Sequence, residues 1–262
     1  MSEEADLATR LPHDRQQAIY MLALRQGSVD GADLARRYGV TTETIRRDLS
    51  DMQDRHLLRR VHGGAVPIEQ INHEPLLERR DRMNAEEKLR IVTIAAEEVP
   101  ERGSVIIDSG STGQRLADVF PVDRDVHVVT NSLTTALTLS RRGLRGLTVL
   151  GGAVRTNTLA MVDDTGCEEL THLAIDTLFI SCDGLSFKHG LTTPHREERA
   201  LKRAMIESAQ RVVAMVDQSK FGNAQMFGFA SFDEIDVLVT DTRVDPEAVD
   251  VLSGHGIFVR RA

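Results

Sequence analysis

Two sets of residues in this chain have the types and spacing for binding chemistry. The first set is polar and basic: Thr41, Thr42, Thr44, Arg46 and Arg47, followed by Arg59, Arg60, His62, Gly63 and Gly64. An arginine can grip a phosphate or a guanine edge with two parallel hydrogen bonds, and paired glycines permit a close backbone approach. Because double-stranded DNA presents phosphates and base edges, the first set predicts a DNA-binding surface.

The second set consists of small polar residues that follow successive apolar runs. Its members are Asp108, Ser109, Gly110, Ser111 and Thr112 after one run, Thr130, Asn131 and Ser132 after the next, Gly152 after a third, and Asp183 and Gly184 after a fourth. Hydroxyls and backbone N–H groups at a helix start can hold an anion with the help of the helix dipole. Lys220, at a further strand end, is the expected ligand-facing cation.

Other readings of the second set are weaker or excluded. The segment is not a P-loop, because no Gly-Lys-Ser/Thr follows, and it lacks the Gly-x-Gly-x-x-Gly fingerprint, so no cofactor is expected. Ser109–Thr112 alone could be an ordinary capped turn. Glu198 and Lys202, four residues apart, could be an exposed helical ion pair.

Local signals predict the elements that position the first set. Pro12 suits a helix start, and Gln26-Gly27 suits its end. Asp30 can cap a second helix, Gly39 allows a sharp turn, and Thr41 can cap a third helix. These features predict a helix-turn-helix, with Leu57 to Ala65 as a basic, glycine-rich wing.

A plainer alternative for the third helix is a solvated face. In that case Arg46-Arg47-Asp48 would hold only internal ion pairs. We favour DNA binding because the helices, the turn and the basic wing occur in register.

An alternation of short apolar runs with amphipathic segments predicts the elements behind the second set. The expected strands are Ser104 to Ile107, Val126 to Val129, Leu147 to Leu150, Thr177 to Ile180, Arg211 to Val216, Val237 to Val239 and Ile257 to Val259. Helical patterns separate most of them, which predicts an α/β domain with a mostly parallel sheet. A binding crevice is expected at the carboxyl ends of its strands.

Composition is that of an ordinary globular protein. The 262 residues include two cysteines, expected as reduced thiols, and no run of about 18 apolar residues, so a cytoplasmic location without a membrane partner is expected. Residues 7–66 carry ten Arg against seven acidic residues, whereas the whole chain has a net charge of −8. This asymmetry fits a DNA-binding head on an acidic body. We expect a DNA-binding domain over 11–66, a linker over 67–84 and an effector-binding, oligomerising α/β domain over 85–262.

Two motifs carry a resemblance to a known family. Thr41–Leu49 and Leu57–Ala65 resemble the N-terminal signature of the DeoR family of bacterial transcriptional repressors, although His56 replaces a usual glycine and Met52 a usual leucine. The resemblance implies a C-terminal fold related to ribose-5-phosphate isomerase and the CoA-transferases. It also implies that the second set lines a site for a phosphorylated sugar or polyol.

One departure from the family lies at Val162-Asp163-Asp164-Thr165, where a Val-Gly-Pro-like loop is usual. These two carboxylates are expected either to face solvent or to mark a different or metal-assisted effector.

The expected function is repression of carbohydrate-metabolism genes, relieved by the effector, in a homodimer or tetramer bound to operator DNA. An isomerase-like enzyme using Asp183, Glu198, Lys202 and Lys220 is one alternative. A DNA-binding scaffold that takes no ligand is the other.

Overall fold

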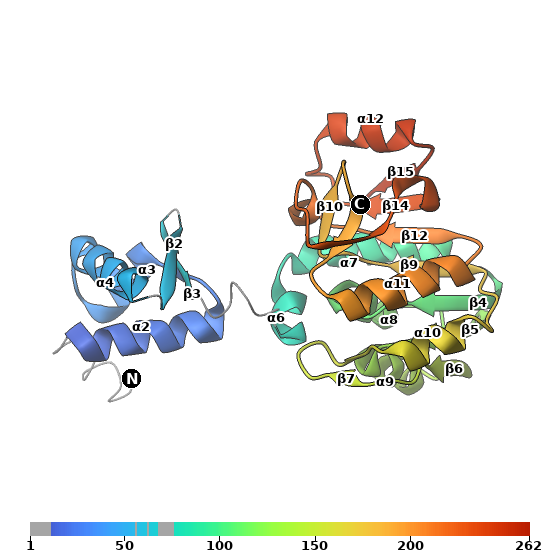
Figure 1. Ribbon diagram of the computed structural model, residues 1–262, viewed down its shortest axis with the longest axis horizontal. Coiled ribbons are helices and arrows are strands. Elements are labelled where there is room, and N and C mark those ends of the chain that lie inside the picture. Colours follow the sequence, from blue (N-terminus) through green and yellow to red (C-terminus); the bar gives the residue numbers. More distant parts are fainter. Residues whose placement is uncertain (1–11, 56, 62, 68–75) are drawn as a thin grey trace. The chain divides into compact units, whose positions relative to one another are not determined.

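The computed structural model describes residues 12–55, 57–61, 63–67 and 76–262. It divides the chain into two compact units, Met1–Pro75 and Leu76–Ala262 (Figure 1).

The first unit is a winged helix-turn-helix, as predicted. Its helices are α2 (Pro12–Gln26), α3 (Gly31–Tyr38) and α4 (Thr42–Asp54), and its antiparallel sheet has the order β1 (Val29–Asp30), β3 (Gly64–Pro67), β2 (Leu58–Val61). The Asp30 side chain accepts hydrogen bonds from two N–H groups of α3, and Gly39 ends that helix with a φ of 63°. The Thr41 side chain accepts from the N–H of Thr44 and so caps α4. The short strand β1 was not predicted.

The second unit is built on a seven-stranded sheet in which every neighbouring pair is parallel. The strand order is β15 (Phe258–Arg261), β14 (Val237–Thr240), β12 (Val212–Met215), β9 (Thr177–Ile180), β4 (Arg102–Ile107), β5 (Asp125–Thr130), β6 (Gly146–Val149). All seven predicted strands are present within a few residues. The predicted α/β fold is therefore confirmed.

Helices cover both faces of this sheet (Figure 1). Side chains of α7 (Ala85–Ala95), α8 (Ser111–Val119) and α9 (Leu133–Arg141) pack on one face, and those of α10 (Asp164–Leu170), α11 (Arg196–Ser208) and α12 (Pro246–Gly254) pack on the other. Strand β4 shows why: Val105 and Ile107 join one apolar cluster while Ile106, between them, joins the other.

Short elements beside the main sheet were not predicted. Strands β10 (Gly184–Ser186), β11 (Gly190–Thr193) and β13 (Phe227–Ala230) form a small antiparallel sheet, and β7 (Val154–Arg155) pairs with β8 (Ala160–Met161). Three 3-10 turns complete the unit: η1 (Ala96–Glu98), η2 (Gln218–Lys220) and η3 (Phe232–Glu234). Unlike the apolar, β-branched runs of the main sheet, these strands contain glycine or span only two residues, so no strand signal marked them.

Part of the expected linker forms a helix of the second unit. Within 67–84, the residues Leu77–Arg82 form helix α6, which belongs to the second unit. Leu77 is buried, and Asp81 pairs with Arg115 of α8 at 2.7 Å. This part of the expected linker is therefore helical and forms ion pairs with the α/β unit.

Candidate functional site

Helix α4 carries an exposed polar face backed by a buried one. Ile45, Leu49 and Met52 pack in the core of the first unit, while Arg46 and Arg47 lie on the opposite, exposed face. Asp48 is buried and accepts a hydrogen bond from Arg15 Nε at 2.6 Å. The local sequence Arg-Arg-Asp is therefore not one solvated ion-pair cluster, because its carboxylate holds α4 to α2.

The two arginines of α4 share Glu43 as an ion-pair partner. Arg46 Nη2 lies 2.7 Å and Arg47 Nε 3.5 Å from Glu43 Oε1. Hydrogen bonding from Arg46 is the main reason why the pKa of Glu43 falls to about 2. More than half of the Arg46 and Glu43 side chains is exposed, at 58% and 51%. Such surface pairs contribute little free energy, so a DNA phosphate or base edge can replace the carboxylate at low cost.

The wing is tied to α4. Arg60 donates from its backbone N–H to Gln53 Oε1 at 2.9 Å and from Nη1 to Ser50 Oγ at 3.1 Å. Arg59 is also exposed, and Gly63 adopts a φ of 80°. Gly64 has a packing role, because a Cβ there would lie 1.9 Å from the carbonyl oxygen of Val29. His62 lies outside the described residues.

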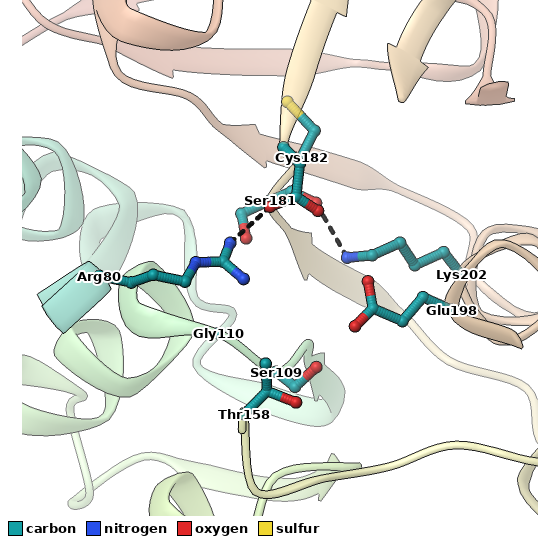
Figure 2. A pocket seen from close by; sticks show the side chains of 9 residues that line it. Arg80, Ser109, Gly110, Thr158, Ser181, Cys182, Glu198 and Lys202 are labelled. Atoms are coloured by element: carbon teal, nitrogen blue, oxygen red, sulfur yellow. Dashed lines mark hydrogen bonds and ion pairs between the residues drawn. The ribbon is translucent and has the colours of Figure 1, made fainter. Parts of the chain in front are cut away.

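A pocket in the second unit lies at the point of the sheet where the order of successive strands reverses. From β4 the chain runs outward through β5 and β6, then returns to β9 on the other side of β4. Ligands of open parallel sheets bind at such a switch point, beyond the carboxyl ends of the strands. The residues that line the pocket are Arg80, Ser109, Gly110, Thr158, Ser181, Cys182, Asp183, Glu198 and Lys202 (Figure 2).

Two cations reach this pocket from different helices (Figure 2). Lys202 of α11 forms an ion pair with Asp108 and donates to the carbonyl oxygen of Ser181 at 3.0 Å. Arg80 of α6 donates to Asp183 Oδ1 at 2.7 Å. The lining therefore holds positive groups that are already paired with protein carboxylates.

The pocket also contains acceptors and an unpaired hydroxyl. Glu198 pairs with Arg155 and accepts from Thr193 Oγ1 at 2.8 Å. Thr158 is only 2% exposed, and its hydroxyl has no hydrogen-bond partner among the described residues. A buried hydroxyl without a partner costs free energy, which points to a bound polar group as its natural partner.

Burial and charge shift the pKa of several groups around the pocket. Burial would raise the pKa of Asp183, but the positive charges of Arg80, Lys202 and Lys220 hold it below its usual value. Asp183 is thus a carboxylate. Burial lowers the pKa of Lys88, which donates to Ser111 Oγ at 3.0 Å, to about 8. Burial likewise raises the pKa of the Cys182 thiol to about 12, so that thiol stays protonated and unreactive.

The structure brings only part of the predicted second set to the pocket. Ser109, Gly110 and Asp183 line it, and Asp108 lies behind Lys202. Asn131 accepts from the Ser109 N–H at 2.9 Å and so positions that loop. The others have local roles: Thr130 bonds the carbonyl of Ile107, Ser132 caps α9, Ser111 and Thr112 begin α8, and Gly152 and Gly184 pack closely against Asp163 and Asn223.

The structure places the candidate cations and carboxylates in different surroundings. Lys220 lies in η2 and does not line the pocket, whereas Lys202 does. The exposed helical ion pair considered for Glu198 and Lys202 is wrong, because both are buried and each pairs with a residue elsewhere in the chain. Asp163 caps α10 by accepting from the Thr165 N–H at 2.8 Å, and it also accepts from the Ala153 N–H at 2.8 Å.

Arg80 and Thr158 were missed altogether. Arg80 lay in the expected linker, and Thr158 lies in the turn between β7 and β8. No sequence signal marked either residue. In the described part of the chain there is also no group of three or more His, Cys, Asp or Glu placed to hold a metal ion. No described helix is long and apolar enough to cross a membrane.

Comparisons with known proteins agree with both units. Residues 15–71 match the DeoR-like helix-turn-helix domain, and residues 83–242 match the DeoR C terminal sensor domain. The chain is 33% identical to the HTH-type transcriptional regulator GlpR of Haloferax volcanii, over 95% of this chain and 97% of that protein. It is 30% identical to the glycerol-3-phosphate regulon repressor of Escherichia coli, over 93% and 96%.

Among solved structures, the chain is similar to ribose 5 phosphate isomerase A from Neisseria gonorrhoeae. That likeness covers 53% of this chain and 54% of the isomerase, with a TM-score of 0.39 and 15% identity. The matches to the two family domains together span most of the chain. One match lies within the first unit of the structure and the other within the second. The chain therefore belongs to the DeoR family of transcriptional regulators.

Proposed function

We propose that this regulator represses carbohydrate-metabolism genes and that a phosphorylated sugar or polyol, bound in the α/β unit, relieves the repression. The observation that carries the proposal is the convergence of Arg80, Lys202 and the start of α8 on one pocket at the switch point of the sheet.

The lining suits both parts of such a ligand. Gly110 is the residue that precedes α8, so the positive end of a nine-residue helix faces the pocket beside two cations, which favours a phosphate. Asp183 and Glu198 are acceptors for ligand hydroxyls, and the Thr158 hydroxyl can donate or accept. The pocket therefore offers positive charge for a phosphate and hydrogen-bonding groups for hydroxyls, which are the two parts of a phosphorylated polyol.

The relatives support the chemical class. One is named as the repressor of a glycerol-3-phosphate regulon, and another, the regulator IolR of Bacillus subtilis, is 28% identical over 95% of this chain. The exposed face of α4 and the wing supply the DNA-binding surface. Because helix-turn-helix proteins commonly read paired half-sites, we propose a homodimer or a larger symmetric oligomer on the operator.

We further propose that the pocket binds without catalysing a reaction. Lys202 and Glu198, the groups that an isomerase-like reaction would use, are held by Asp108 and Arg155. Turnover of a sugar phosphate by the full chain, lost on changing Glu198, would favour the enzyme instead.

The proposal is tested with a labelled duplex from the upstream region of the protein's own gene. The full-length protein is titrated onto it at fixed salt, since affinity for DNA depends steeply on salt. Glycerol 3-phosphate, fructose 1-phosphate and fructose 6-phosphate, each with its dephosphorylated form, are then added. Release by one phosphorylated compound and not by its dephosphorylated form is expected. Tight DNA binding that no compound alters would contradict the proposed sensing role and leave a ligand-free scaffold.

A further inference from the structure

Helix α6 forms one wall of the pocket and is the first element of the second unit. Its Leu77 N–H donates to the carbonyl oxygen of Asn157 at 2.8 Å, in the same turn that carries Thr158. Asp81 pairs with Arg115, Arg80 pairs with Asp183, and Lys88 Nζ donates to the carbonyl oxygen of Arg80. The helix is therefore held mainly by polar contacts, several of which involve groups of the pocket.

The pocket is nearly filled by its own side chains. Its free volume is about 10 Å³, which is room for about one water molecule. A phosphorylated sugar has ten or more heavy atoms, roughly, and small-molecule sites are commonly at least about 300 Å³. A ligand of the proposed class can enter only if part of the lining moves.

Compared with α11 and the loops that follow β4 and β9, α6 has the weaker attachment to the apolar core. The loops after β4 and β9 continue strands at the centre of the sheet, and Lys202 comes from α11, whose Leu201 and Met205 belong to an apolar cluster. Leu77 of α6 is buried but belongs to neither of the two apolar clusters that sandwich the sheet. Displacing this six-residue helix therefore disrupts less apolar packing than displacing α11 or the loops that follow β4 and β9.

We propose that Arg80 is a direct contact for the anionic group of the effector, and that α6 moves as the lid of the pocket when Arg80 leaves Asp183 to make that contact. The inference rests on the proposed function. Because the chain continues from α6 through residues 68–75 towards the DNA-binding unit, the movement of the lid acts on the connection between the two units.

Charge explains why Arg80 must change partners. An effector dianion near Asp183 would be repelled by that carboxylate unless it brought in a cation of its own; Arg80 supplies that cation when it turns to the anionic group, while Lys202 and Lys220 still offset the charge of Asp183. Arg80 is the cation that already contacts Asp183, and a guanidinium can bind a phosphate through two parallel hydrogen bonds. Once released, Asp183 is free to accept hydrogen bonds from ligand hydroxyls.

The test compares Arg80→Ala with Arg82→Ala in the full-length protein. Arg82 lies on the same helix, is exposed and does not line the pocket, so it is a matched control. Calorimetry measures the affinity for the compound that releases the operator from the wild type, and operator release is measured in parallel. For Arg80→Ala, effector affinity weaker by on the order of 10- to 100-fold is expected, because a charge-assisted contact is lost. The effector affinity of Arg82→Ala should stay within about threefold of the wild type. The operator affinity of both variants without effector should stay within the same range.

Hydrogen exchange tests the movement of the lid. In the wild type, the amides of residues 76–84 should change their protection when the effector binds, and Arg80→Ala should lose that change at saturating effector. Unchanged protection of these amides in the wild type would overturn the lid.

The outcomes separate the inference from the proposed function. If no phosphorylated compound binds the wild type, both fail. If the wild type binds and releases DNA while Arg80→Ala does the same at equal concentrations, only the inference fails. Arg80→Lys keeps the charge but not the planar fork, so its effector affinity should lie between those of the wild type and Arg80→Ala. Complete loss of effector binding in Arg80→Lys, with intact folding, would still support the bidentate contact.

Discussion

The two units use charge in opposite ways. On α4 the ion pair between Arg46 and Glu43 leaves 58% and 51% of the two side chains exposed. In the pocket the ion pair between Lys202 and Asp108 leaves only 7% and 2% exposed. An exposed arginine keeps most of its hydration and exchanges partners at little cost, whereas a buried ion loses hydration and depends on its partner.

The difference matches the two kinds of recognition. DNA offers many similar phosphates, so a surface that binds it gains from side chains that rearrange easily. A small effector must be told apart from other metabolites, and a desolvated, fully paired site makes each mismatch expensive. The contrast supports the proposal that the first unit makes adaptable contacts to DNA and the α/β unit makes selective contacts to an effector.

The buried side of the comparison is tested by Lys202→Met. Removal of one partner leaves Asp108 as an uncompensated buried carboxylate, so the free energy of unfolding should fall by about 3–5 kcal/mol. Urea unfolding followed by probes in the second unit measures it. The double variant Lys202→Met with Asp108→Asn should recover part of the loss. If the single variant loses less than about 1 kcal/mol of unfolding free energy, the pair contributes no more than a solvent-exposed ion pair does.

The exposed side is tested by replacing Arg46 and Arg47 together with alanine. Each arginine that contacts a base edge or phosphate contributes about 1–3 kcal/mol, so specific operator affinity should fall on the order of 100-fold or more. Folding and effector binding should stay unchanged, because both side chains are exposed. Arg145→Ala, at an exposed arginine of the second unit, is the control. Equal operator affinity in the double variant would remove α4 from the DNA-binding surface.

Removal of the unpaired Thr158 hydroxyl should affect effector affinity and stability differently. Thr158→Val keeps the shape of the side chain and removes a buried group that has no partner among the described residues. Stability should be unchanged or slightly higher, while effector affinity should fall by about 0.5–1.5 kcal/mol, the usual net value of one hydrogen bond. Thermal unfolding and calorimetry on the same samples give both quantities. A variant that binds the effector as tightly as the wild type would exclude Thr158 as a contact.

The smallest expected effect concerns pH. Burial lowers the pKa of Lys88 to about 8, and the charges that act on this lysine are those of Asp217, Lys220, Arg80 and Asp81. Its protonated form prevails below that pH and adds positive charge beside Arg80, whose carbonyl oxygen it binds, so effector affinity should fall severalfold between about pH 7 and 9. The same lowered pKa means that the unfolded chain binds more protons between about pH 8 and 10.5, so the Lys88 contribution to stability rises with pH in that window.

Lys88→Gln supplies the comparison for this pH effect. It should give a flat profile of effector affinity over the same range. A profile in that variant as steep as in the wild type would assign the pH dependence to another group.

The same contrast between exposed and buried charge explains how much the sequence could predict. The helix-turn-helix and the seven parallel strands depend on caps, glycine turns and apolar periods that lie within a few residues of one another. The buried pairs do not: Lys202 meets Asp108 across 94 positions, and Arg80 meets Asp183 across 103. No local pattern encodes such partners, so Lys202 looked like half of a helical surface pair and Arg80 like part of a linker.

The strand-end rule indicated part of the pocket lining. It named Ser109, Gly110 and Asp183, which follow β4 and β9 and line the pocket. It could not tell these residues from Thr130 and Ser132, which lie at and beyond the end of β5 but make local hydrogen bonds. The order of the strands decides which ends flank the switch point, and that order arises only from long-range pairing.

If the two units are coupled as proposed, operator and effector must affect each other's binding reciprocally. If an effector weakens operator binding by a given factor, thermodynamic linkage requires that saturating operator duplex weaken effector binding by the same factor, about 5- to 150-fold for typical coupling. Effector affinity of the full-length protein is therefore measured with and without the duplex, at one salt concentration. We expect weaker effector binding in the presence of the operator. Equal affinities in the two conditions would show that the pocket and the DNA-binding surface act independently.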